Sequence, residues 1–96
     1  MKFLHYTVTT EPHGTIRVYL TGSAANVLVM DDPSFQKFQL GQAYRYYGGH
    51  YTASPAIIKP PYPGRWNIVV NLGGLAGTVN AVVEVTHEVA PASVSP

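Results

Sequence analysis

Cysteine is absent from this sequence, which excludes disulfide bonds and thiolate metal sites. Charge is scarce as well, because Asp, Glu, Lys and Arg make up only 11% of the 96 residues, against ~25% in typical soluble domains. The two signs nearly cancel, and the formal net charge is +1. A surface with so little charge is poorly protected against association, so we expect a homo-oligomer more readily than the length alone suggests.

Clustered basic residues and long apolar runs are missing too. The six Lys and Arg residues are scattered along the chain, whereas binding a phosphate backbone requires them to cluster, so we expect no nucleic-acid partner. No apolar run reaches the ~20 residues of a membrane span, so we expect no membrane association. The N-terminus starts like a signal peptide but loses its apolar run at His5, which favours a cytoplasmic protein of bacterial type.

Helical periodicity is nearly absent, and alternation of apolar and polar residues takes its place. The alternation is clear over residues 2–10, 16–21, 66–72 and 79–86. Turn-forming Gly and Pro residues separate these segments, so we predict an all-β fold, a small antiparallel two-sheet β-sandwich of about seven strands. We expect it to form a single domain over residues 1–89. Residues 90–96 have little to bury and are predicted to be a disordered tail.

One segment departs from the alternation. Asp32 is a suitable N-cap, and Pro33 suits the first position of a helix because its missing amide would have no partner there. We therefore predict at most one short helical turn, over residues 33–39. That turn would carry Phe35 and Phe38 to the edge of the core.

The paired glycines Gly48-Gly49 suit a tight two-residue turn, where a positive φ costs glycine little. We therefore predict a hairpin with residues 44–47 and 50–52 as its arms. The turn would stand at the tip of the hairpin.

Alternation also assigns the faces of the last two strands. Trp66 begins an apolar face that continues through Ile68 and Val70, so we predict it to be a core anchor. Val69 and Val82 fall on the opposite faces of their strands. If these outward valines are covered by a second copy of the chain, the protein is a structural homo-oligomer.

Residues that carry catalytic chemistry do not occur in a recognisable arrangement. The four histidines, at positions 5, 13, 50 and 87, have no metal-ligand spacing. No serine lies in a nucleophile elbow, and the only adjacent carboxylates, Asp31 and Asp32, are explained by a helix or turn cap. We predict no catalytic residue, no metal, no cofactor and no enzymatic activity.

An aromatic cluster is the one unusual local feature of the chain. Exposed Tyr and Arg side chains bind well because they offer a large amphipathic area at a small entropic cost. The alternative is that these rings pack at the core or at a sheet edge. The predicted binding residues are Arg45, Tyr47, His50, Tyr51 and Tyr62.

These residues make a non-enzymatic binding or protein-interaction module the leading functional prediction. Alternation would turn Arg45 and Tyr47 outward together and Tyr44 and Tyr46 inward. A cation beside an aromatic ring suits a protein partner, a small glycan or an anionic ligand. The alternatives are the structural homo-oligomer and a carbohydrate-binding β-sandwich with stacked tyrosines.

Several short motifs follow one another along the chain: Ser23-Ala24-Ala25-Asn26-Val27, Tyr46-Tyr47-Gly48-Gly49, Ser54-Pro55, and Gly64-Arg65-Trp66 followed by Asn71-Leu72-Gly73-Gly74. In this order they resemble a small bacterial family named domain of unknown function 1883, over nearly the whole chain. The resemblance implies an all-β fold and no established activity. Some members of such families are fused to signalling domains of the Toll/interleukin-1-receptor type, which implies a sensing or interaction role.

Overall fold

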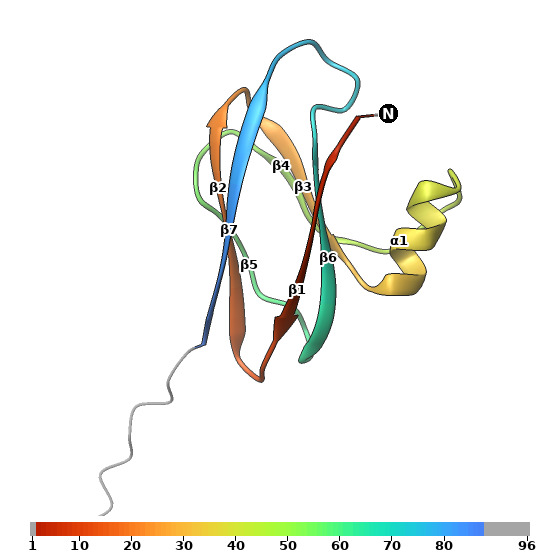
Figure 1. Cartoon of the computed structure of the whole chain (residues 1–96), viewed down its shortest axis with the longest axis vertical. Coiled ribbons are helices and arrows are strands. Elements are labelled where there is room, and N and C mark those ends of the chain that lie inside the picture. Colours follow the sequence, from red (N-terminus) through yellow and green to blue (C-terminus); the bar gives the residue numbers. More distant parts are fainter. Residues whose placement is uncertain (1, 88–96) are drawn as a thin grey trace, which may run out of the picture.

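The alternating segments form strands in the computed structural model, which describes residues 2–87 (Figure 1). In chain order the elements are β1 (Leu4–Thr10), β2 (Gly14–Gly22), β3 (Ala25–Met30), α1 (Asp32–Gln39), β4 (Tyr47–Tyr51), β5 (Ala56–Ile58), β6 (Gly64–Asn71) and β7 (Val79–His87). The predicted tail, residues 90–96, lies outside the described residues.

The strands pair into two antiparallel sheets. Sheet A has the order β1-β6-β3-β4, and sheet B has the order β5-β2-β7. Leu4 of β1 lies opposite Val70 of β6, and Gly14 of β2 lies opposite His87 of β7. The predicted all-β sandwich is therefore confirmed.

The inward residues of both sheets fill the space between them. Trp66 is fully buried there, as predicted, and its indole N–H donates to the carbonyl oxygen of Tyr62 at 3.2 Å. Pairing that indole N–H matters because an unpaired polar group would be costly to bury. The other large, fully buried residues of this core are Ile16, Val18, Val27, Val29, Ile68 and Val70.

Helix α1 lies on the outer side of sheet A (Figure 1). A second apolar cluster fills the space between them. Val69 belongs to it and is 0% exposed. The expectation that Val69 would be available to a second copy is therefore wrong, because α1 of the same chain covers it. The cluster consists of Leu28, Met30 and Val69, with Phe3, Phe35, Phe38 and Tyr44 packed against them.

Helix α1 is longer than predicted and begins one residue earlier. Its N-cap is Asp31 rather than Asp32, and the Asp31 carboxylate accepts a hydrogen bond from the Ser34 N–H at 2.8 Å. The helix has eight residues, about two turns. Phe35 and Phe38 lie three positions apart, so both contact the second cluster, and this packing stabilises the second turn.

The predicted hairpin at Gly48-Gly49 is wrong. Both glycines lie inside β4, where Gly48 is opposite Leu28 and Gly49 is opposite Val27 of β3. Gly48 has a φ of 116°, and a Cβ atom there would collide with the carbonyl oxygen of Val27. The glycine therefore permits a close approach of two strands and does not mark a turn.

Candidate functional site

The predicted binding residues do not form one surface. Arg45 is exposed in the irregular segment between α1 and β4. Alternation within β4 places Tyr51 against the core between the sheets and His50 on the outer face of sheet A. Tyr47 and Tyr62 contact Trp66 instead. Arg45 and Tyr47 do not share a strand face, because residues 42–46 lie outside any strand.

Tyr47 and Tyr62 close one end of the sandwich around Trp66. The Tyr47 ring meets Trp66 edge to face, with centroids 5.8 Å apart, and the Tyr62 ring is tilted against it at 4.8 Å. Partial desolvation, and then the nearby Asp31 carboxylate, raise the pKa of the Tyr62 phenol above 10.0. The two rings therefore pack against Trp66 and stay partly exposed, Tyr47 at 41% and Tyr62 at 49%.

His50 lines a cleft of about 390 Å³ on the outer face of sheet A, beside α1. We call it the Asn–His cleft. Its principal lining residues are Asn26 of β3, His50 of β4 and Asn71 of β6, with Phe38, Tyr44 and Tyr46 on the side of α1.

The three polar residues of the cleft form a row across three neighbouring strands. Strand register places His50 opposite Asn26, and Asn26 opposite Asn71. The Gly73 N–H donates to the Asn71 Oδ1 atom at 2.9 Å, and the Asn26 Nδ2 group donates to the same oxygen at 3.0 Å. Because the backbone N–H can only donate, it determines the orientation of the Asn71 amide, and through it that of the Asn26 amide.

The same row determines which nitrogen of His50 carries hydrogen. The Asn26 Oδ1 atom lies 3.1 Å from the His50 Nδ1 atom and can only accept, so Nδ1 is the donor. The neutral ring therefore presents Nε2 as an acceptor. Among residues 2–87, no hydrogen bond uses the Asn71 Nδ2 group, which stays available as a donor. The cleft thus combines a free donor with a free acceptor.

Aromatic rings form the other wall of the cleft. Tyr44 packs edge to face on Phe38, with centroids 5.2 Å apart, and Tyr46 follows at 5.7 Å from Tyr44. Tyr44 is anchored in the second apolar cluster, whereas Tyr46 is 48% exposed. The wall therefore has a buried support and an exposed ring.

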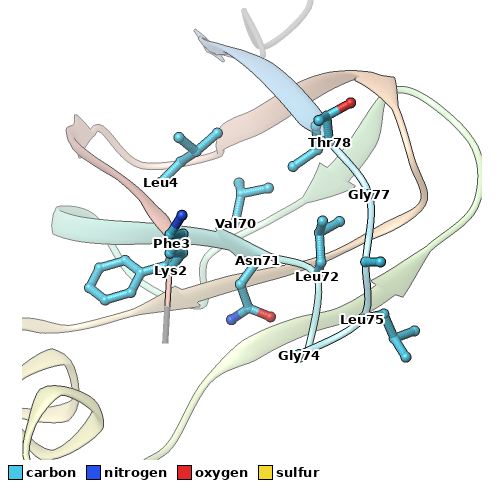
Figure 2. Close-up of a pocket in the computed structure, with 12 residues that line it drawn as sticks. Lys2, Phe3, Leu4, Val70, Asn71, Leu72, Gly74, Leu75, Gly77 and Thr78 are labelled. Atoms are coloured by element: carbon cyan, nitrogen blue, oxygen red, sulfur yellow. The ribbon is translucent and has the colours of Figure 1, made fainter.

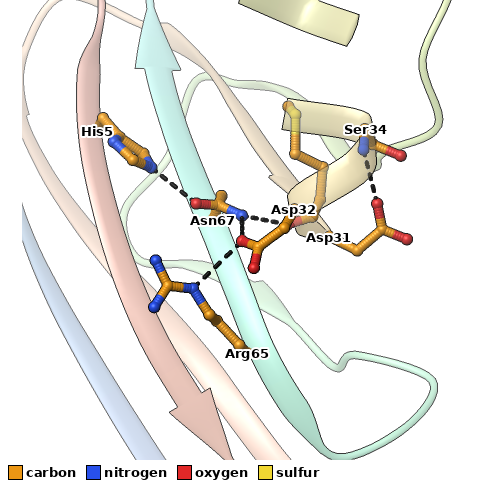
Figure 3. Close-up of polar contacts among 7 residues, drawn as sticks. His5, Asp31, Asp32, Ser34, Arg65 and Asn67 are labelled. Carbon is orange, nitrogen blue, oxygen red and sulfur yellow. Dashed lines mark hydrogen bonds and ion pairs between the residues drawn. The ribbon is translucent and has the colours of Figure 1, made fainter. Parts of the chain in front are cut away.

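A second polar network joins the start of α1 to sheet A (Figure 3). Asn67 is buried, and its Nδ2 group donates to the Asp32 carboxylate at 2.7 Å and to the Met30 carbonyl at 3.4 Å. Both partners are acceptors, so the Asn67 Oδ1 atom faces the His5 Nε2 atom at 2.9 Å, and that nitrogen donates. Arg65 completes the network with an exposed ion pair to Asp32 at 3.2 Å.

The electrostatics of this network stabilise the position of the helix. The hydrogen bond from Asn67, and then the Arg65 guanidinium, lower the pKa of Asp32 below 3.8. Hydrogen bonding to Ser34, through its side chain and its backbone N–H, lowers the pKa of Asp31 in the same direction. The Asp32 carboxylate attaches α1 to the sheet through Asn67 and Arg65, whereas the Asp31 carboxylate caps the start of the helix. These two roles explain the Asp31-Asp32 pair structurally.

Within the range 2–87, no group of three or more His, Asp or Glu residues is arranged to hold a metal ion. No helix in the described part of the chain is long and apolar enough to cross a membrane.

Sequence reasoning missed Asn26 and Asn71. The two residues are 45 positions apart, and only the pairing of β3 with β6 brings them together. One local signal was present, since asparagine is disfavoured inside strands and here interrupts apolar strand segments. Such residues indicate positions where an amide has a specific hydrogen-bonding partner.

Comparison with known proteins gives a family assignment. No curated protein matches the chain, and no solved structure does. The family model described as "Domain of unknown function (DUF1883)" matches residues 1–89, which is nearly the entire chain and agrees with the motif resemblance. This chain belongs to the DUF1883 family.

Proposed function

We propose that this protein is a non-enzymatic binding module, and that the Asn–His cleft holds a small uncharged ligand rich in hydroxyl groups, such as a sugar. The observation that carries the proposal is the row of His50, Asn26 and Asn71, whose hydrogen bonds orient both amides and the imidazole before any ligand arrives. Groups oriented in advance lose little entropy on binding.

Size and charge favour a neutral ligand. A volume of about 390 Å³ lies near the lower end of the ~300–1,000 Å³ range of small-molecule sites. None of the described residues that line the cleft is Asp, Glu, Lys or Arg, so a charged ligand would find no countercharge. Hydroxyl groups suit the cleft because each can both donate and accept.

The aromatic wall supports the same ligand class. Tyr46 offers an exposed, apolar ring face next to the polar row. A sugar matches both features, since its apolar C–H face can stack on the ring and its hydroxyl groups can bond to the polar row. Tyrosine provides such a stacking surface at a small entropic cost.

The test is a titration with a panel of mono- and disaccharides, followed by NMR of the Asn26 and Asn71 side-chain amides. We expect chemical-shift changes confined to residues of the cleft. Tyr46→Ala and His50→Ala should each bind the sugar about tenfold more weakly, which corresponds to a loss of about 1.4 kcal/mol of binding free energy. Tyr62→Ala is the matched control, because Tyr62 is 49% exposed but lies outside the cleft.

Three results would contradict the proposal. They are no saturable shift with any sugar of the panel, equal losses in Tyr46→Ala and Tyr62→Ala, or shifts centred on Trp66. Melting temperatures of the variants separate a loss of binding from a loss of folding.

A structural homo-oligomer is the second candidate, and the outer face of sheet B favours it. Tyr19, Ile57 and Val82 are all exposed there, and Tyr19 lies opposite Val82. Arg17 lies opposite Glu84 beside them, so the exposed apolar residues are flanked by one charge of each sign. A stable dimer buries about 1,200 Å² or more in total, so the interface would extend beyond these residues.

A further inference from the structure

The two ends of the sandwich are filled differently. At one end Trp66 occupies the space between the sheets, flanked by Tyr47 and Tyr62. The other end, beside the start of β1 and the β6–β7 connection, holds a cavity of about 770 Å³ (Figure 2). Its size lies well inside the ~300–1,000 Å³ range of ligand sites.

Apart from Phe3, the apolar walls of this open end are aliphatic. Leu4, Val70 and Leu72 come from the side of sheet A, and Val79 comes from β7 of sheet B. Leu4, Leu72 and Val79 are only partly buried, although they pack against the core between the sheets. The core therefore exposes a concave apolar surface here, and covering it with an aliphatic chain is favourable because apolar surface leaves water.

The charge at the rim of the cavity indicates which head group a bound aliphatic chain would carry. Among the described residues that line the cavity, Lys2 carries the only charge. Its methylene groups extend apolar surface, and its ammonium group can meet an anion at the mouth. Thr78 and Asn71 add uncharged polar groups to the same lining.

The β6–β7 connection keeps the cavity open. Its end is tied to residue 23 by two hydrogen bonds, from the Ser23 N–H to the Thr78 carbonyl at 2.7 Å and from the Thr78 N–H to the Ser23 hydroxyl at 3.3 Å. Leu75, at the tip, is 74% exposed and points away from Leu4 and Val70 (Figure 2). It does not fill the cavity and adds apolar surface at the lip.

We infer that this open end is a binding site for a free anionic amphiphile, a medium-chain carboxylate whose alkyl chain enters between the sheets and whose head group meets Lys2. The site is separate from the Asn–His cleft except for Asn71, which lines both. Its existence does not depend on the sugar proposal.

The test is calorimetric titration with dodecanoate below its micelle concentration. Dodecyltrimethylammonium serves as the probe of the same chain length with the opposite head group. We expect saturable one-site binding of dodecanoate and much weaker binding of the cation. Lys2→Glu should weaken dodecanoate binding at least about tenfold and reverse the preference. The matched control is Lys59→Glu, which makes the same charge change at the opposite end of the sandwich, outside this cavity.

A second variant tests the cavity itself. Leu72→Trp places an indole in the space and should abolish dodecanoate binding while the chain stays folded, as judged by its melting temperature. Absence of saturable dodecanoate binding to the wild type overturns the inference. So do equal losses in Lys2→Glu and Lys59→Glu, unchanged binding in a folded Leu72→Trp, or binding only to vesicles of anionic phospholipid. Tyr46→Ala should leave dodecanoate binding unchanged, which keeps this test distinct from that of the cleft.

Discussion

Helix α1 covers part of the outer face of sheet A, whereas the outer face of sheet B carries no helix within residues 2–87. The exposed fractions of Val69 and Val82 show the difference between the two faces. Both are outward residues of alternating strands, yet Val69 is 0% exposed and Val82 is 66% exposed. Asn67 and Asn80 differ in the same way, since Asn67 is buried in a hydrogen-bonded network and Asn80 is exposed.

The comparison shows what alternation measures. It reports which residues point away from the core between the sheets, and it does not report whether that outer face meets solvent. Because β6 lies inside sheet A and beneath α1, both of its faces are buried, and it behaves like a central strand of a three-layer fold. β7 is an edge strand with one partly buried face.

The largest effect should separate the two valines. Val69→Asp buries an unpaired carboxylate under α1, and we expect it to lower the free energy of unfolding by about 4 kcal/mol or more. Val82→Asp should change it by no more than about 0.5 kcal/mol. Urea denaturation of both variants measures the contrast, and similar losses would mean that the two faces are equally covered.

A smaller contrast is expected for the two asparagines. Asn67→Ala removes the hydrogen bonds to Asp32 and Met30 and should lower the free energy of unfolding by about 2 kcal/mol. Asn80→Ala, on the outer face of sheet B, should have an effect within about 0.5 kcal/mol. If Asn67→Ala is as mild as Asn80→Ala, the network does not hold α1 on the sheet.

Lowering the pH should weaken the stabilisation that Asp31 provides as the N-cap of α1. The folded-state pKa of Asp31 is lowered below 3.8, so its stabilisation is fully present above that value and is lost as the pH falls through it toward the folded-state pKa. Asp31→Asn keeps a good N-cap residue but does not titrate. The stability difference between wild type and Asp31→Asn should therefore be present at about pH 6 and shrink as the pH falls below 3.8. A constant difference would show that the charge of Asp31 plays no part.

The smallest effect on stability is expected for a substitution on the outer face of sheet B that tests self-association. If a second copy covers sheet B, Val82→Glu should abolish a concentration-dependent rise in sedimentation coefficient while leaving the melting temperature of the monomer unchanged. Gln36→Glu, at an exposed position of α1, is the control, because it changes the net charge by the same amount. Wild-type protein that sediments only as a monomer at high micromolar concentration would remove the homo-oligomer from consideration.

Sequence patterns predicted most of the scaffold because they are local. Alternation is enough to place Trp66 in the core, and a capping residue followed by Pro33 is enough to place a helix near residues 33–39. The glycine pair failed because a positive φ serves a turn and a close strand approach equally well, and only the neighbouring strand decides between them.

The candidate site was less accessible to prediction because its parts are distant in sequence. His50 was identified from its aromatic neighbours, but its partner Asn26 lies 24 positions away, and the contact depends on the register of β3 and β4. Tyr47 and Tyr62 were assigned to the same surface as His50, although they meet at Trp66. Register is set by the whole hydrophobic pattern of both strands, so a single segment does not reveal it.

The pairing of early strands with late ones also determines when this protein can fold during synthesis. β1 pairs with β6, and β2 pairs with β5 and β7, so neither N-terminal strand has its described partners until most of the chain has been made. Such long-range pairing slows folding to roughly the millisecond-to-second range, because the ends of long loops must meet first. The apolar faces of β1 and β2 therefore emerge from the ribosome before their partner strands have been made, and until then they are exposed to association with other chains.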